Sequence, residues 1–281
     1  MLTTIWRRLK PLLLMVSPTL VQYVVSYRFY QRCKVRFGSF QKKIRPILFG
    51  NGTPLVLSGP FQGLPYLDEI GFCGPIFPKW LGSYECELHD FWHGVLSKSP
   101  ATIIDIGSAE GYYAVLLAAK LPRTEVHSFD FDPLAIRAQR RLAILNQVTN
   151  LIMRKFCDHR ILGELLSASP GRSLIICDIE GAETELIDPT ACPELLLADL
   201  LVELHESSGK ILEDVIRCIG DRFSTTHITQ FIPIRPRNPS LYASYAAALS
   251  MEDLSRALDE VRGISRGWLA LTKRAQHESF S

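Results

Sequence analysis

One stretch of the sequence combines small residues and carboxylates at a spacing that suits the binding of a small ligand. An apolar run carries Asp105 and is followed by Gly107 and Gly111, with Ser108 and Glu110 between the two glycines. The glycines do not form the Gly-x-Gly-x-x-Gly pattern that packs a pyrophosphate against a helix, and no Gly-Lys-Ser/Thr follows, so a dinucleotide is disfavoured and a P-loop is excluded. Carboxylates repel phosphate and suit a ligand with an ammonium or sulfonium charge.

A further carboxylate stands at an informative distance from this turn. Asp130 lies nineteen residues after Gly111, close to the offset of about 20 at which an acidic residue on the second strand accepts ribose hydroxyls. Tyr112 opens the segment after the turn, where its ring could face a sulfonium, although burial in helix packing is the commoner arrangement. Together these residues predict a site for an adenosyl ligand without phosphates.

Alternating strands and helices must position these residues. Apolar runs predict seven strands, and the helical periodicity predicts helices between or after them. The strands are expected at 101–106, 125–129, 151–156, 173–177, 200–204, 225–234 and 267–272, and the helices at 112–120, 133–147, 241–262 and from residues 159, 182 and 210. This alternation predicts an α/β fold with a doubly wound, mostly parallel seven-stranded sheet, and the ligand of such a sheet binds beyond the carboxyl ends of the strands.

The composition indicates a folded globular chain with an unusual distribution of charge. Of 281 residues 47% are hydrophobic and 21% are charged, which excludes a disordered or multi-span membrane protein. Ten Lys or Arg precede Asp68, the first acidic residue, and the remaining 21 basic and 29 acidic residues leave the rest of the chain at −8. A basic end of this kind is expected to meet an anionic surface, either lipid headgroups or nucleic acid.

The basic N-terminal segment has features of a membrane-interface helix. Residues 11–27 carry no charge and are flanked by Lys and Arg, but they are short and polar for a spanning helix and lack a signal-peptide cleavage pattern. A helix lying in the interface fits better, and a helix packed on the domain is the alternative. Three parts are expected: the basic apolar segment 1–45, a Gly/Pro-rich cover or linker 46–82, and the α/β domain 83–275.

Seven cysteines without a Cys-x-x-Cys pair indicate reduced thiols and neither a disulfide framework nor a zinc module. The expected location is therefore cytoplasmic, with peripheral contact at the inner face of the membrane through the N-terminal segment. The oligomeric state has no signature in the sequence.

From residue 80 to residue 273 the chain resembles the class I S-adenosylmethionine-dependent methyltransferases, and within them the FkbM-type family. In that family a strand ending in D-x-G-x-x-x-G binds the methionine part of the cofactor, and Asp105, Gly107 and Gly111 match it. An acidic residue at the end of the second strand holds the ribose, which here is Asp130 where the family more often has Glu. An acidic residue after the third strand approaches the adenine amino group, and this would be Asp158.

The most specific match to the family is the motif D-x-E-G-x-E, formed by Asp178, Glu180 and Glu183. The fifth strand departs from the family pattern by an additional His205 and a following glutamate. Methyl transfer needs alignment and, for a hydroxyl acceptor, a base, so Asp178, Glu180 and His205 are the candidate catalytic residues by position. A structural bond between His205 and a neighbouring carboxylate such as Glu203 is the alternative for that histidine. These side chains could also gather a divalent ion, but no ligand spacing demands one, so no metal is predicted.

The resemblance implies S-adenosylmethionine as the cofactor and methylation of an oxygen on a small molecule or a glycan. A nucleic-acid methyltransferase, which the absence of base-stacking aromatic spacing disfavours, and a non-catalytic adenosyl-binding scaffold are the alternatives. Tyr84 and Glu85 are expected to cover the cofactor. Acceptor specificity is expected from residues 233–262, where Arg235, Arg237 and Tyr242 could meet an anionic group.

Overall fold

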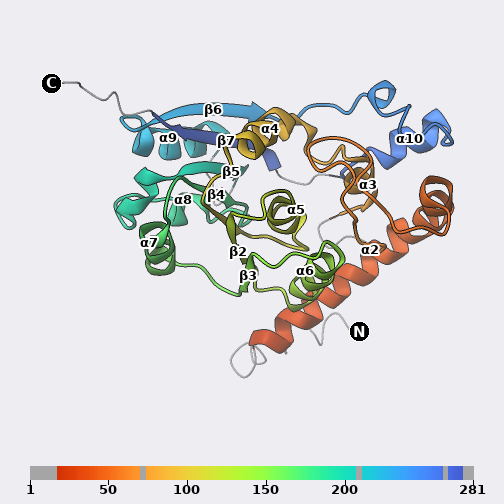
Figure 1. Ribbon diagram of the computed structural model, residues 1–281, viewed down its shortest axis with the longest axis horizontal. Coiled ribbons are helices and arrows are strands. Elements are labelled where there is room, and N and C mark those ends of the chain that lie inside the picture. The colour runs from red at the N-terminus through yellow and green to blue at the C-terminus, as the bar shows by residue number, and fades with distance from the viewer. Residues whose placement is uncertain (1–17, 70–73, 207–210, 262–264, 275–281) are drawn as a thin grey trace.

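The computed structural model describes residues 18–69, 74–206, 211–261 and 265–274. Its centre is a seven-stranded sheet of order β3-β2-β1-β4-β5-β7-β6 (Figure 1). The first five strands pair in parallel, and β7 pairs antiparallel with both β5 and β6. The strands are β1 (Thr102–Ile106), β2 (Glu125–Phe129), β3 (Leu151–Arg154), β4 (Ser173–Cys177), β5 (Asp199–His205), β6 (His227–Pro233) and β7 (Ser265–Lys273).

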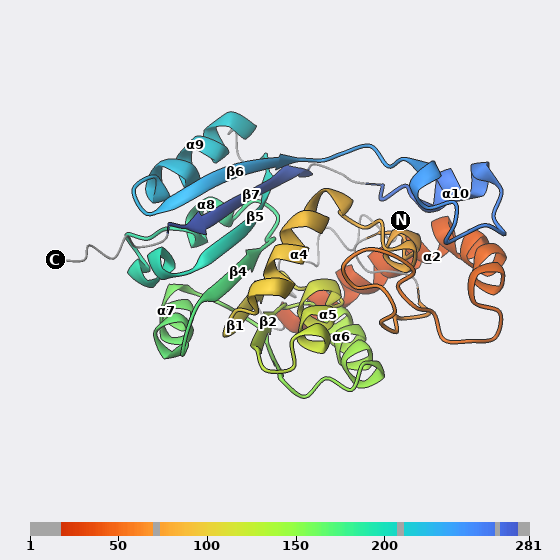
Figure 2. The ribbon, with the colours of Figure 1, turned by 45° about the horizontal axis from the view of Figure 1, so that its top comes forward.

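Helices cover both faces of the sheet (Figure 2). Alternate residues of the central strands pack into two separate apolar clusters, one with α5 and α6 and one with α7 and α9, because successive side chains of a strand point to opposite faces. The doubly wound α/β fold predicted from the sequence is therefore confirmed. The helices of the domain are α4 (His89–Lys98), α5 (Tyr112–Lys120), α6 (Pro133–Leu145), α7 (His159–Ala168), α8 (Glu183–Leu186), α9 (Leu212–Phe223) and α10 (Met251–Ala257), with 3-10 turns at Cys86–Leu88, Pro193–Leu197 and Pro239–Leu241.

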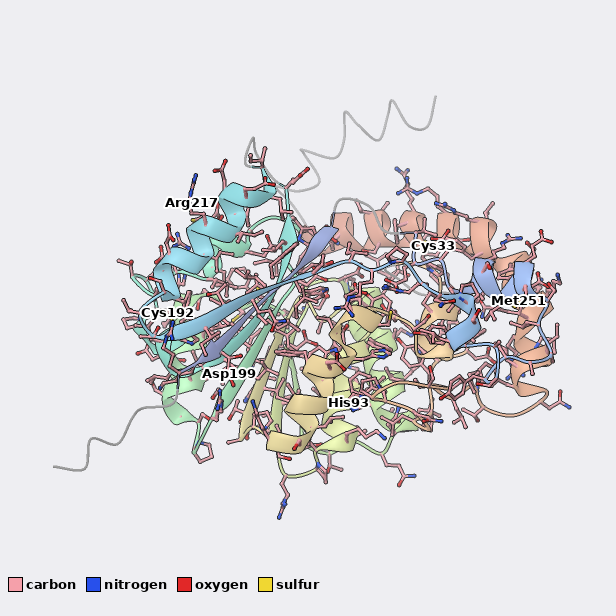
Figure 3. All side chains as sticks on the ribbon, turned by 90° about the horizontal axis from the view of Figure 1, so that it is seen from above. Cys33, His93, Cys192, Asp199, Arg217 and Met251 are labelled. Atoms are coloured by element: carbon pink, nitrogen blue, oxygen red, sulfur yellow. The ribbon has the colours of Figure 1, made fainter. Side chains whose placement is uncertain are left out.

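One predicted helix is largely wrong. The range 241–262 was expected to be helical throughout, whereas within its described part only a short turn at its start and α10 are helical. The Ser250 side chain accepts a hydrogen bond from the backbone N–H of Asp253 at 3.2 Å, and this cap starts a new helix in the middle of the range. Figure 3 shows how far this segment extends, with Met251 at one end of the molecule and Arg217 of α9 at the other.

A long N-terminal helix, α2 (Pro18–Phe49), crosses the side of the domain and packs on α6. Its buried residues Cys33, Phe40 and Ile44 recur at spacings of seven and four, as expected for one helical face. The predicted boundary at residue 45 lies inside this helix, and residues 1–17 of the predicted interface segment lie outside the described residues. Within the described ranges, no helix combines the length and the apolar character needed to cross a bilayer.

The segment between α2 and α4 forms a cover over α5. It contains α3 (Phe77–Leu81) and an antiparallel bridge between Leu55 and Pro65. Phe61, Tyr66 and Trp80 are buried in it, and the rings of Phe61 and Tyr66 meet the ring of Tyr112 edge-on. The Gly/Pro-rich segment therefore packs directly beside the predicted ligand turn.

Candidate active site at the carboxyl ends of the strands

The turn between β1 and α5 approaches the end of β4 more closely than any side chain would allow. Gly107 has φ +86°, and a Cβ built on it would lie 1.6 Å from the carbonyl oxygen of Asp178. Gly111 has φ +87° and would place a Cβ 2.7 Å from the side chain of Gln139. Both conformations are accessible to glycine at little cost. The two glycines therefore allow the turn to contact the end of β4 and the side of α6.

Asp105 is buried and holds the start of α5. Its Oδ2 accepts a hydrogen bond from the backbone N–H of Ala114 at 3.0 Å, which satisfies one of the free amides of the first helical turn. Burial raises the pKa of this carboxyl from its ordinary 3.8 to about 7, the Ala114 amide opposes the rise, and the charge of Asp130 adds to it. Asp105 thus positions the turn.

Asp130 closes the turn from the end of β2. Its two carboxylate oxygens accept hydrogen bonds from the backbone N–H groups of Ala109, at 2.8 Å, and Asp132, at 2.7 Å. Burial raises its pKa, and these two amides oppose the rise. Ser108 is buried beside it and accepts a hydrogen bond from the Gln139 amide at 3.1 Å. Asp130 therefore lies at the position expected for a ribose-binding carboxylate and is held there by backbone contacts.

Glu110 pairs with a lysine that the sequence analysis did not single out. Its carboxylate forms a buried ion pair with Lys79 of α3, whose ammonium also lies 4.7 Å from the ring centre of Tyr84 and 5.8 Å from that of Tyr112. The predicted cofactor contact of Glu110 is thus already neutralised, and the pair joins the cover to the turn. Tyr112 itself is buried in this aromatic packing.

Asp158 begins α7 as its N-cap, since its Oδ1 accepts a hydrogen bond from the backbone N–H of Ile161 at 2.8 Å. Two exposed aromatic side chains that the sequence motifs do not include follow the ends of β2 and β3. Phe131, two residues after β2, is 67% exposed, and Phe156, two residues after β3, is 69% exposed. Large aromatic residues directly after adjacent parallel strands were the available signal, because both strand ends lie at the ligand-binding edge.

The ends of β4 and β5 bring one histidine among four carboxylates. His205 is 3% exposed, and its Nδ1 lies 2.9 Å from Glu183 Oε1. Its Nε2 lies 3.6 Å from Glu180 Oε2, 3.8 Å from Glu203 Oε2 and 3.9 Å from Asp178 Oδ1. The three predicted catalytic residues are therefore brought together, and the closest carboxylate to the histidine is Glu183 rather than a neighbour on the same strand.

Glu183 organises this cluster. Its Oε1 accepts hydrogen bonds from the backbone N–H groups of Ile179, at 3.2 Å, and Gly181, at 3.0 Å, in addition to the contact with His205. Burial alone would raise its pKa, but these bonds outweigh burial and lower it. Glu183 therefore fixes both the loop after β4 and the imidazole of His205.

The electrostatics of the cluster follow from burial and crowding. Burial raises the pKa of Asp178 well above its ordinary value, and the charge of Glu203 and a side-chain hydrogen bond with it raise the pKa further. Two carboxyl groups can form such a bond only by sharing a proton. Burial lowers the pKa of His205, but the bond to Glu183 and the surrounding carboxylates outweigh it, so the net shift is upward.

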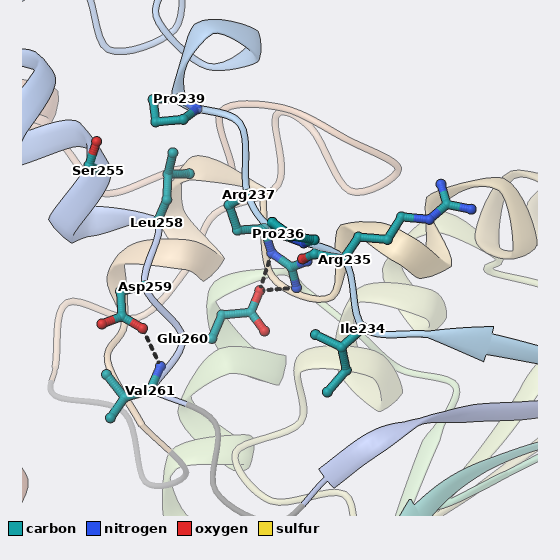
Figure 4. Close-up of a pocket in the computed structure, with 10 residues that line it drawn as sticks. All are labelled: Ile234, Arg235, Pro236, Arg237, Pro239, Ser255, Leu258, Asp259, Glu260 and Val261. Atoms are coloured by element: carbon teal, nitrogen blue, oxygen red, sulfur yellow. Dashed lines mark hydrogen bonds and ion pairs between the residues drawn. The ribbon is translucent and has the colours of Figure 1, made fainter.

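A network of buried side chains leads from α5 to an open cavity. Tyr113 donates a hydrogen bond to Glu85, and the backbone N–H of Glu85 donates one to Glu260 Oε1 at 3.0 Å. Glu260 lines a cavity of about 360 Å³ between the β6 end and α10 (Figure 4). Arg237 forms ion pairs there with Glu260 and with the buried Glu87.

Of the three residues expected to contact the methyl acceptor, two are already engaged or buried within the protein. Arg237 is committed to two buried carboxylates, and Tyr242 is buried. Arg235 extends away from Glu260 toward the rim of the cavity (Figure 4). Of the three, Arg235 has the geometry to meet a ligand from solvent.

No family model and no curated protein matches the chain. Among solved structures, TYW2 from M. jannaschii in complex with AdoMet is similar at 16% identity with a TM-score of 0.40, over 63% of this chain and 69% of that chain. A 16S rRNA (adenine(1408)-N(1))-methyltransferase from Catenulisporales acidiphilia with SAM is similar at 12% identity and a TM-score of 0.40, over 67% and 92%. A Klebsiella pneumoniae protein described provisionally as an O-methyltransferase is similar at 14% identity and a TM-score of 0.40, over 65% and 77%.

Similarities this distant carry no argument about activity, and the fold rests on the strands themselves. From the central pair β1 and β4, the parallel strands β2 and β3 follow on one side of the sheet and β5 follows on the other. The antiparallel β7 lies between β5 and β6. The change in strand order between β1 and β4 is the point at which such sheets bind ligands. The chain has the Rossmann-like fold of the class I methyltransferases, as predicted from its sequence.

Proposed function

We propose that this protein is an S-adenosylmethionine-dependent methyltransferase of the FkbM type that methylates an oxygen of a small molecule or glycan. One observation carries the proposal: the glycine turn after β1 packs on the β4 end and places Asp105, Asp130 and Asp178 at the ends of three adjacent strands. Burial raises the pKa of each of these three carboxyl groups. A positively charged ligand beside them favours their ionised form, whereas a phosphate would oppose it, so this edge suits a ligand with positive charge and no phosphate.

Each predicted residue has a role that its contacts allow. The Asp130 carboxylate is held by two amides and would accept the ribose hydroxyls with its remaining lone pairs. Phe131 and Phe156 offer exposed rings for an adenine, beside the capping Asp158. Asp105 and the two glycines shape the turn that would hold the methionine part of the cofactor. Ser108 and Glu110 fix this turn through their contacts with Gln139 and Lys79.

Bound S-adenosylmethionine would supply an electrophilic methyl group whose thioether leaves without protonation. The protein must then align the acceptor in line with the methyl group and exclude water, which contributes up to about 7–11 kcal/mol. Because Glu183 accepts the Nδ1–H of His205, the Nε2 atom of the neutral ring keeps its lone pair, with Asp178 and Glu180 beside it. His205 can therefore act as general base for a hydroxyl acceptor.

Calorimetric titration of S-adenosylmethionine and S-adenosylhomocysteine into the full chain tests this proposal. Wild type is expected to bind both ligands at micromolar concentration, and Asp130→Ala is expected to bind at least tenfold more weakly. The matched control is Asp132→Ala, since Asp132 caps α6 through backbone N–H groups and has no assigned ligand contact. Absence of binding to folded wild type would overturn the proposal, and binding without methyl transfer to any glycan or small-molecule acceptor would favour a scaffold.

The N-terminal helix supports a peripheral contact with an anionic membrane. Arg32, Lys34 and Arg36 are exposed on α2, together with Tyr23, which is 43% exposed, and Tyr27, which is 48% exposed. Basic side chains contribute about 1 kcal/mol each near an anionic bilayer, and aromatic rings prefer its interface. The helix would therefore hold the active site near lipid-linked acceptors.

Co-sedimentation with vesicles of 30% phosphatidylserine would measure this contact. The double variant Lys34→Gln/Arg36→Gln is expected to weaken vesicle binding about tenfold or more, whereas Arg160→Gln/Arg217→Gln, which removes the same charge from α7 and α9, leaves it unchanged. Equal loss in both doubles, or tighter and more salt-dependent binding to RNA than to vesicles, would contradict the membrane contact and favour a nucleic-acid substrate.

A further inference from the structure

Three side chains at the ends of β4 and β5 converge on one point. One ligand atom each from Asp178, Glu203 and His205 lies within 4.8 Å of the others. Glu203 and His205 are two residues apart and share a face of β5, and the pairing with β7 is irregular between them. Irregular pairing of this kind commonly redirects a side chain beside an active site.

His205 is oriented as a metal-ligating histidine would be. Its side chain is 3% exposed, and Glu183 accepts the hydrogen of Nδ1 at 2.9 Å. A carboxylate on one ring nitrogen fixes the tautomer and leaves the other nitrogen as a ligand. Among the described residues no hydrogen bond reaches Nε2, although three carboxylate oxygens lie 3.6–3.9 Å away.

A second polar atom points into the same space without a partner. Asp178 Oδ1 is buried and makes no hydrogen bond with the described residues, and it lies 3.9 Å from His205 Nε2. The side chain of Asp178 is also hydrogen bonded with Glu203, a contact in which a divalent cation can replace the shared proton. Buried polar atoms of a native protein are normally satisfied, and one cation would satisfy both Asp178 Oδ1 and His205 Nε2.

We propose that Asp178, Glu203 and His205 form a binding site for a divalent transition-metal ion. Two carboxylates and one imidazole suit Mn²⁺, Fe²⁺ or Zn²⁺ rather than Ca²⁺, which takes six to eight oxygen ligands. The side chain of Asp178 is 32% exposed, so solvent or a substrate can reach the remaining coordination positions through it. The sequence alone predicts no metal here, because the three ligands do not form a recognisable metal-binding spacing along the chain.

The role of the ion in catalysis rests on the proposed function. An acceptor hydroxyl in an open position would become more acidic on binding the ion. Because Nε2 of His205 is then a ligand of the ion, Glu180 replaces His205 as the base. The O–H bond of the acceptor breaks and its proton passes to the Glu180 side chain, which is 78% exposed and can release it to solvent. The oxygen then forms a bond to the methyl carbon of S-adenosylmethionine, the carbon–sulfur bond breaks, and its electron pair stays on sulfur. The ion keeps its oxidation state.

Titration of MnCl₂ into the chelator-treated full chain, without S-adenosylmethionine, tests the site by calorimetry and electron paramagnetic resonance. Wild type is expected to bind one Mn²⁺ and to show nitrogen modulation from a coordinated imidazole. Asp178→Asn and Glu203→Gln are expected to weaken binding at least tenfold, and His205→Asn is expected to abolish the nitrogen signal. The matched control is Glu125→Gln, which removes the carboxylate 2.6 Å from the buried His127 of the same sheet.

Each outcome separates this site from the cofactor site. Mn²⁺ binding that is absent from folded wild type, or unchanged in all three ligand variants, would overturn the metal site even if S-adenosylmethionine binds. Mn²⁺ binding with the expected variant pattern supports the metal site even if S-adenosylmethionine does not bind, in which case the proposed methyltransferase activity alone is overturned. The Asn and Gln variants preserve side-chain size, and circular dichroism verifies that each is folded.

Discussion

Replacement of Asp105 by Asn should change how the stability of this protein depends on pH. The carboxyl is 3% exposed, and burial raises its pKa from 3.8 to about 7. Between these values the folded state binds more protons at this site than the unfolded state, so the free energy of unfolding falls as pH rises from about 4 to 7. A difference of roughly three pKa units sets an upper limit of about 4 kcal/mol on the loss.

The Asp105→Asn variant mimics the protonated carboxyl and keeps an oxygen that can accept the Ala114 amide. Its stability relative to wild type should therefore increase by about 2–4 kcal/mol between pH 4.5 and pH 7.5. Urea unfolding at four pH values in this range, followed by circular dichroism, measures the difference.

The control is Asp188→Asn. Thr190 amide and hydroxyl contacts lower the pKa of Asp188, so this carboxyl has finished titrating below the measured range. If the Asp105→Asn and wild-type curves run parallel from pH 4.5 to 7.5, the account of Asp105 as a buried, mostly protonated acid is refuted.

Three further predictions concern stability and share the same unfolding assay. Gly107→Ala should cost more than about 4 kcal/mol or prevent folding, because its Cβ would lie 1.6 Å from a carbonyl oxygen, whereas Gly63→Ala, at φ +85° with nothing within 4 Å, should cost about 1–2 kcal/mol. Equal costs would contradict the close approach. Arg237→Met should cost about 3–5 kcal/mol, since it removes the ion-pair partner of two buried carboxylates, and the exposed Arg160→Met should cost no more than about 0.5 kcal/mol. Lys79→Met should cost about 3 kcal/mol, part of which returns when its partner carboxylate is also neutralised; no recovery in the double variant would show that the charge pair is not the cause.

Local patterns were sufficient for most of the fold. The predicted strands at 125–129 and 173–177 and the helix at 112–120 have the observed bounds. The strand at 173–177 and the helix are runs of mostly apolar residues with glycine or charged residues at their boundaries. The helix predicted over 241–262 was wrong because its alanine-rich composition satisfies helical propensity, while the Ser250 cap and tertiary packing divide it.

The glycine turn, the carboxylates at the strand ends and the ligand-binding edge of the sheet can all be inferred from the order of residues along the chain. Which charges meet depends on how the elements pack. Lys79 reaches Glu110 across 31 residues, and Glu183 reaches His205 across 22, because the cover packs on α5 and because β4 and β5 are adjacent in the sheet. Charge pairing depends on distance and burial, and neither quantity is contained in the order of residues along the chain.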